Sequence, residues 1–160
     1  MADRARSVTI HTQSIVVNIS PFAFHRWSQQ YLAAAKAVSP SPSFSPVPYY
    51  LQGLATELAL KAFLLAKGIA RKTLATRKLG HDLKALLALS DQKGLSQYCS
   101  ITPEQRSHLS LLNDYYSSRA LEYFPLKKAL MGFSGLPDLA IVAGFLECLL
   151  PSIEAECKSA

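Results

Sequence analysis

Apolar residues recur every three or four positions along most of the chain, which is the spacing of one face of an α-helix. The strongest such stretch begins at Tyr49 and ends near Lys67, where Gly68 is a plausible stop. Its apolar positions are Leu51, Leu54, Ala55, Leu58, Leu60, Ala62, Phe63, Leu64 and Leu65. They cover most of the circumference, and a helix of this kind packs in the middle of a bundle.

The segments before this helix differ from it in composition. Ser20 and Pro21 are typical of a helix start, and the Ala-rich stretch that follows continues the helical spacing to Val38. Residues 39–48 contain four Ser and four Pro, so they cannot continue a helix; they fit either a loop or a polyproline ligand. Residues 1–19 are predicted to be an N-terminal arm, either a short strand or a segment packed on the bundle or on a second subunit.

The second half of the chain predicts three more helices. A short one is expected over about residues 81–93. Residues 102–105 read Thr-Pro-Glu-Gln, a capping box that opens the next helix, which we expect to carry Arg119. The last helix is expected over about residues 138–150, with Pro151 ending or kinking it.

Composition narrows the class of protein. With 160 residues, 49% of them apolar and 18% charged, the chain can bury one core, and we predict an all-α, up-and-down bundle of four or five helices over residues 20–157. The longest apolar run, residues 139–150, is too short to cross a bilayer, and the N-terminus lacks the apolar core of a signal peptide, so no membrane association is expected.

Cys99, Cys148 and Cys157 are odd in number and lack metal-ligand spacing. This indicates reduced thiols in the cytoplasm, with no metal and no cofactor.

The formal net charge of +6 favours an anionic partner. Basic side chains collect after the central helix, where no acidic residue lies between Glu57 and Asp82. They are Lys67, Arg71, Lys72, Arg77, Lys78 and Lys84. Such a segment can bind nucleic-acid phosphates in a salt-dependent way, and a solvated loop between helices explains it equally well.

In this order the features resemble the HEPN superfamily, helical-bundle proteins of prokaryotic toxin and defence systems. The resemblance covers roughly residues 20–150. It rests on the helix with Glu57-x-x-x-Lys61, the turn Gly80-His81-Asp82-Leu83, and a helix ending YYSSRALEYFP. It implies a bundle that forms a homodimer, here through a central apolar helix. Some members serve nucleotidyltransferase-like proteins as partners.

Many members of that superfamily are metal-independent ribonucleases in which Arg is followed, after four to six residues, by His. Arg119 fits the first position, but residues 120–127 contain no His. We therefore expect a non-catalytic or degenerate member that binds RNA or nucleotide, or that serves a nucleotidyltransferase-like or antitoxin partner. One alternative is a metal-independent endoribonuclease toxin, with His81 as acid–base group and Arg119 on the phosphate. Another alternative is a purely structural interaction module.

The residues predicted to line the cleft are Glu57, Lys61, His81 and Arg119. If the central helix is buried, an ionised Glu57 must find a partner, and His81 or Arg119 is the obvious one. Glu57 and Lys61 are also spaced for a simple ion pair one helical turn apart.

Three neighbouring residues carry similar alternatives. Asp82 either contributes to the site or complements the positive end of a helix, which His81 can also cap. Arg119 can pair locally with Glu122. Tyr123, like Tyr115 and Tyr116, can stack on a base or fill the bundle core.

Overall fold

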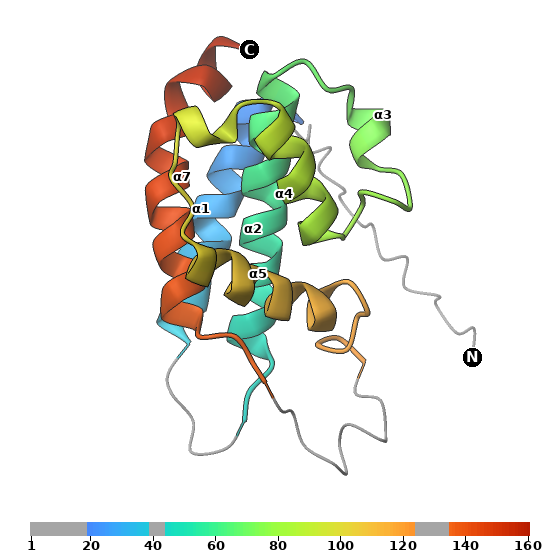
Figure 1. The fold of residues 1–160 in the computed structure, drawn as a ribbon, viewed down its shortest axis with the longest axis vertical. Coiled ribbons are helices and arrows are strands. Elements are labelled where there is room, and N and C mark those ends of the chain that lie inside the picture. Colours follow the sequence, from blue (N-terminus) through green and yellow to red (C-terminus); the bar gives the residue numbers. More distant parts are fainter. Residues whose placement is uncertain (1–18, 39–43, 124–134) are drawn as a thin grey trace, which may run out of the picture.

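The computed structural model describes residues 19–38, 44–123 and 135–160, and every regular element in these ranges is a helix. The elements are α1 (Pro21–Ala37), α2 (Val47–Ala66), α3 (Arg71–Leu74), α4 (Leu83–Gln92), the 3₁₀-helix η1 (Leu95–Gln97), α5 (Pro103–Tyr116) and α7 (Leu139–Ser159). In Figure 1, α1, α2 and α7 run side by side and α5 crosses them. The predicted all-α bundle is therefore confirmed. The N-terminal arm and most of the Ser/Pro-rich segment lie outside the described residues.

Helix α2 is the centre of the bundle, because it packs against α1, α4, α5 and α7. Its side chains Leu60, Phe63 and Leu64 are completely buried, as are Ala55 and Ala59. Burying each large apolar side chain stabilises the fold by roughly 1.5–3 kcal/mol. The apolar circumference that suggested a dimer interface is thus covered within the chain, and dimerisation stays a prediction.

Side-chain caps begin the helices where the sequence predicts them. Ser20 Oγ accepts a hydrogen bond from Ala23 N at the start of α1. Thr102 forms the expected capping box of α5, and Asp138 caps α7. Helix α2 begins at Val47, two residues before the predicted start, because Pro48 is accommodated in its first turn.

The predicted end of the last helix near residue 150 is wrong, since α7 continues through Pro151 to Ser159. The alternative, that Pro151 kinks the helix, stays a prediction. An internal proline removes one backbone hydrogen bond, at a cost of about 3 kcal/mol. Beyond it, Ile153 and Cys157 are buried in the core, and this packing offsets the loss. No helix in the described ranges, α7 included, is long and apolar enough to cross a membrane.

The prediction of reduced thiols is wrong for two of the three cysteines. Cys99 and Cys148 form a disulfide bond between the segment after η1 and α7, with Cα atoms 6.0 Å apart. The chain separates them by 49 residues, so only the packing of α7 brings them together. Cys157 is free, and burial raises the pKa of its thiol to about 11. The expectation of a cytoplasmic location was based on reduced thiols, and the disulfide removes that basis.

Candidate functional site

Glu57 is the centre of a polar network that connects three parts of the chain. Its carboxylate accepts hydrogen bonds from Lys61 Nζ at 2.5 Å, His81 Nδ1 at 2.9 Å and the Tyr116 hydroxyl at 2.6 Å. Lys61 Nζ also donates to the carbonyl oxygen of Gly80 at 2.6 Å. Glu57 is 5% exposed, so its charge needs these partners. The predicted Glu57–Lys61 pair and the predicted Glu57–His81 contact are both confirmed.

Tyr116 reaches Glu57 because α2 has a glycine at the crossing with α5. A Cβ added at Gly53 would overlap the Tyr116 ring, 2.9 Å from its Cε2 atom. Burial, followed by the charge of Glu57, raises the pKa of the Tyr116 hydroxyl, which therefore stays protonated and donates. Tyr116 is a site residue absent from the predicted cleft. The isolated glycine within an apolar helix was the one sequence signal of this close approach.

His81 and Asp82 have different roles in the turn before α4. Asp82 Oδ1 accepts a hydrogen bond from Ala85 N and caps α4, as one of its two interpretations predicted. His81 does not cap the helix, since its Nδ1 contacts Glu57. A carboxylate accepts, so Nδ1 carries the hydrogen of this bond, and Nε2 is the ring nitrogen that Glu57 does not engage. The His81 side chain is 58% exposed, and Nε2 is therefore available to a ligand.

Arg119 lies in a turn after α5, not within it, because α5 ends at Tyr116. The Arg119 N–H donates to the carbonyl of Tyr116 and the Ala120 N–H to that of Tyr115, both at 3.0 Å. This pair of bonds is a Schellman motif, in which the residue at the Arg119 position takes a left-handed conformation. Arg119 has φ 57°, and it is the only residue other than glycine with positive φ in the described ranges.

Helix α2 ends in the same motif, with a glycine at the corresponding position. The Gly68 N–H donates to the carbonyl of Leu65 and the Ile69 N–H to that of Leu64. Gly68 has φ 79°, which glycine adopts without steric cost. An arginine in this conformation costs about 1–2 kcal/mol. Backbone strain of this kind is often found where a side chain has a function.

Arg119 makes neither of its predicted pairs. Within the described residues, no carboxylate lies at ion-pair distance from its guanidinium, so it contacts neither Glu57 nor Glu122 in this way. The Arg119 side chain is exposed. Glu57 is satisfied by His81, Lys61 and Tyr116 in its place, because these side chains reach it from α2, α5 and the turn before α4.

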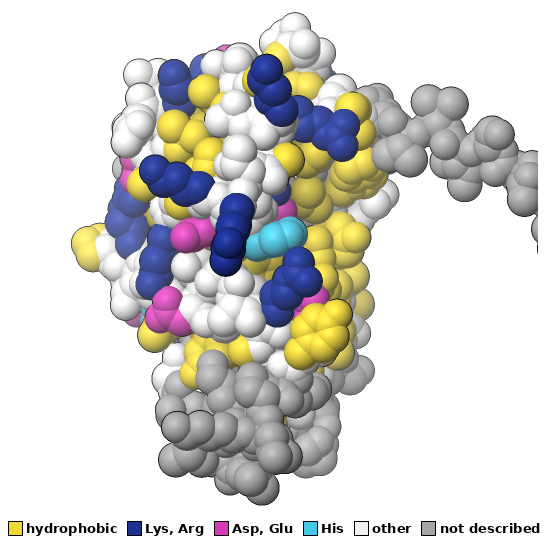
Figure 2. All heavy atoms as spheres, turned by 90° about the vertical axis from the view of Figure 1, so that its right-hand side faces the viewer, with side chains coloured by type: hydrophobic (Ala, Val, Ile, Leu, Met, Phe, Trp, Pro, Cys, Tyr) yellow, Lys and Arg dark blue, Asp and Glu magenta, His cyan; other side chains and the backbone are white. Residues whose placement is uncertain are grey.

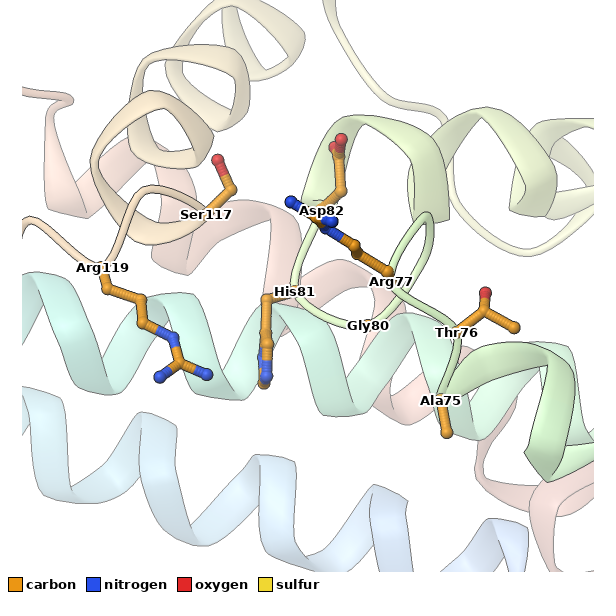
Figure 3. Close-up of a pocket in the computed structure, with 8 residues that line it drawn as sticks. All are labelled: Ala75, Thr76, Arg77, Gly80, His81, Asp82, Ser117 and Arg119. Atoms are coloured by element: carbon orange, nitrogen blue, oxygen red, sulfur yellow. The ribbon is translucent and has the colours of Figure 1, made fainter.

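A pocket of about 530 Å³ lies between the loop before α4 and the turn after α5. It is lined by Ala75, Thr76, Arg77, Gly80, His81, Asp82, Ser117 and Arg119. Figure 3 shows the side chains of His81 and Arg119 next to each other, both directed towards the side of α2 and α1. Two arginines and one aspartate line the pocket, so the net charge of its lining is positive. These residues can bind an anion through the two guanidinium groups.

The predicted basic group divides into two parts. Lys67 is bonded to Glu156 and Tyr98, and Lys84 is bonded to Asp114, so both charges are compensated. The other four, Arg71, Lys72, Arg77 and Lys78, are exposed and have no carboxylate partner among the residues the structure describes. Figure 2 shows dark-blue basic side chains around an exposed histidine on this face.

The remaining predicted residue, Tyr123, is 68% exposed in the same turn as Arg119. Tyr116, by contrast, is 5% exposed and belongs to the core. No group of three His, Cys, Asp or Glu side chains in the described parts of the chain could hold a metal ion.

The chain has no match among protein-family models, curated proteins or solved structures.

Proposed function

We propose that this protein binds a phosphate group of RNA or of a nucleotide in the pocket between Arg77, His81 and Arg119. The observation that carries the proposal is the Arg119 guanidinium, which has no carboxylate partner within the described ranges and is held at the pocket by a strained helix end. Arg77 enters the same pocket, and two guanidinium groups suit the oxygens of a phosphate.

The exposed basic residues next to the pocket favour RNA over a small anion. Arg71, Lys72, Arg77 and Lys78 extend the positive surface beyond the pocket itself. Contacts between such side chains and successive phosphates release counterions, which makes affinity fall steeply with salt.

The polar network favours binding over catalysis. Cleavage of RNA without metal needs one group to take the 2′-hydroxyl proton and a second to protonate the leaving oxygen. Glu57 accepts three hydrogen bonds and is therefore a positioning group for His81. We accordingly keep the non-catalytic, HEPN-like assignment, including its homodimer and its nucleotidyltransferase-like or antitoxin partner, as proposals supported by the sequence resemblance.

The test is fluorescence anisotropy with labelled single-stranded RNA over a series of salt concentrations. Arg119→Ala should weaken binding about 10-fold or more, which is the loss expected for one charged hydrogen bond. The control is Arg106→Ala, which removes the same charge from α5 at a site where the guanidinium is engaged with Asp91. Equal effects of the two substitutions, or affinity that does not change with salt, would contradict the proposal.

One observation favours a second candidate, the metal-independent ribonuclease. Glu57 fixes His81 with Nε2 exposed, as a general base requires, and Arg119 lies in the same pocket. End-labelled structured RNA, incubated in EDTA with the protein or with Arg119→Ala, distinguishes the two functions. Cleavage by the protein but not by the variant would establish the nuclease, and intact RNA that is nevertheless bound would support the binding role.

The third function, a structural interaction module, predicts neither binding nor cleavage. In that case the polar residues would serve only to hold the helices together. Arg119→Ala would then be expected to lower thermal stability, a result for which the described contacts offer no reason.

A further inference from the structure

The connection between α4 and α5, residues 93–102, is cross-linked to α7. In Figure 1 it is drawn in yellow and lies along α7. The backbone N–H groups of Tyr98 and Cys99 both donate to the carbonyl of Leu95, so these hydrogen bonds stay within the connection. The disulfide bond from Cys99 to Cys148 leads out of it, to a helix that is remote in the sequence. This bond therefore fixes where the connection lies on the bundle.

The two cysteines of this bond differ in their access to solvent. Cys99 is 2% exposed, whereas Cys148 belongs to the exposed part of α7. A disulfide is reduced by a thiolate that attacks one of its sulfur atoms, and the rate depends on how accessible that sulfur is. A dissolved thiol can thus attack at Cys148 while the bundle remains closed.

A second, non-covalent attachment of the connection lies next to the disulfide. The Tyr98 hydroxyl donates to Glu156 of α7 at 2.8 Å and accepts a hydrogen bond from Lys67 Nζ at 2.7 Å. Lys67 Nζ and Glu156 also form an ion pair at 2.6 Å, and their side chains are partly exposed. Ion pairs that water reaches contribute little to stability and are screened by salt. Without the disulfide, the connection would depend on these weak contacts and on the packing of Leu95, which is completely buried.

We propose that the disulfide between Cys99 and Cys148 is a redox-controlled clamp on the α4–α5 connection. Reduction by a dithiol releases residues 93–102 from α7 while the rest of the bundle stays folded. The bundle persists because α1, α2 and α7 pack against one another through side chains outside the connection, among them Phe63 and Phe145, which are completely buried. This clamp does not depend on the proposed function, and a failure of either leaves the other in place.

The release is a two-electron reduction in two exchange steps. A thiolate of the dithiol attacks Cys148 Sγ and forms a mixed disulfide; the bond between the two cysteines breaks, and Cys99 Sγ leaves with the electron pair and takes a proton. The second thiolate of the dithiol then attacks the reductant's sulfur in the mixed disulfide, and Cys148 Sγ leaves and is protonated in turn. The dithiol ends as a cyclic disulfide and both cysteines end as thiols.

Labelling of the cysteines with iodoacetamide tests the clamp, with the third cysteine as an internal control. Cys157 is free, 2% exposed and outside the connection, so it reacts only when α7 itself is released from the core. The full chain is reduced with dithiothreitol, desalted and pulsed with iodoacetamide, and each site is quantified by peptide mass spectrometry. Rates are divided by those of the same thiols in urea, where all are accessible. Cys148 should react at once, and Cys99 should react at least about 10-fold faster than Cys157, because local opening is more frequent than global unfolding.

Three results would overturn the clamp. Labelling of Cys148 alone after reduction would mean that the connection stays packed without its cross-link. Equal corrected rates at Cys99 and Cys157 would mean that reduction loosens the whole bundle, as for a purely structural disulfide. Labelling of Cys148 before reduction would mean that the bond does not form.

Substitutions separate the two attachments of the connection. Cys148→Ser removes the disulfide at its exposed end and should give Cys99 the labelling rate of the reduced protein without any reductant. Glu156→Gln removes the charge that holds Tyr98 and Lys67, and in the reduced protein it should speed labelling of Cys99 by up to about 5-fold. The matched control is Glu154→Gln, which removes the same charge from α7 at an ion pair with Lys158 and should leave the rate unchanged. Equal rates in the two glutamine variants would contradict the second attachment, and with it the proposed opening.

Discussion

Replacing Arg119 by glycine separates the backbone role of this residue from the role of its side chain. The left-handed conformation costs an arginine about 1–2 kcal/mol, while glycine adds about 0.5–1 kcal/mol of unfolded-state entropy. The difference is a net stabilisation of about 0.5–1 kcal/mol. For a chain of this length that raises Tm by about 1–4 °C. Arg119→Gly should therefore be slightly more stable than the natural protein and should bind RNA as weakly as Arg119→Ala.

Arg119→Ala keeps the strained conformation, and no described contact of the guanidinium is lost, so its stability should stay within about 0.5 kcal/mol of the natural protein. The reverse substitution is Gly68→Ala, which places a side chain at the corresponding position of the Schellman motif that ends α2. An added Cβ would meet nothing there within 4 Å, so the expected loss of about 1 kcal/mol comes from the backbone alone. Thermal melts followed by circular dichroism, together with RNA binding by anisotropy, measure all three variants.

A lower Tm for Arg119→Gly than for Arg119→Ala would refute this reasoning, because it would mean that the turn does not favour glycine. A loss of 1 kcal/mol or more in both variants would assign the guanidinium a structural partner. Either result would remove the observation on which the proposed phosphate site depends.

Four further predictions concern stability. Glu57→Gln leaves the buried ammonium group of Lys61 without its carboxylate and should lower the free energy of unfolding, measured by urea denaturation, by about 3 kcal/mol. A loss below 1 kcal/mol would contradict the polar network. Gly53→Ala should cost about 1–3 kcal/mol by overpacking against Tyr116, whereas an unchanged Tm would mean that the ring can move away. Reducing the disulfide between Cys99 and Cys148 should lower stability by about 4 kcal/mol, as expected for a closed loop of this size, and melts with and without dithiothreitol measure it. The raised pKa of Tyr116 means that above pH 10 the unfolded chain loses this proton while the folded protein keeps it. Stability should therefore fall with a slope of up to about 1.4 kcal/mol per pH unit, and the decline should flatten in Tyr116→Phe.

Local contacts within the site could be predicted from the sequence, and long-range ones only in part. The bond between Glu57 and Lys61 follows from their spacing, because residues four apart lie on the same side of a helix. The contact of Glu57 with His81 was one of two options left by the argument that a buried carboxylate needs a partner. The structure selects His81 over Arg119, since the turn before α4 packs directly against α2 and the turn after α5 presents Arg119 to solvent.

The errors have a common physical cause. For Arg119 and Pro151 the prediction used helix propensity, which considers only neighbouring residues. Where α5 and α7 actually end depends on how these helices pack against the rest of the bundle. Arg119 has ordinary helix propensity, yet α5 ended earlier and placed it at a position that favours glycine. Pro151 is a helix breaker in isolation, yet buried residues on both sides kept α7 continuous.

The sequence by itself determined the all-α class, the central place of α2, the caps of the helices and the positive charge between Glu57 and Asp82. All of these depend on residues within a few positions of one another, where the pitch of the helix relates spacing directly to geometry. Tertiary structure alone decided that Tyr116 joins Glu57 and that Cys99 meets Cys148, across 59 and 49 residues. It also left Arg119 at the pocket without a carboxylate partner among the residues that the structure describes. Contacts over such distances depend on how whole helices pack, and no local pattern specifies which helices will meet.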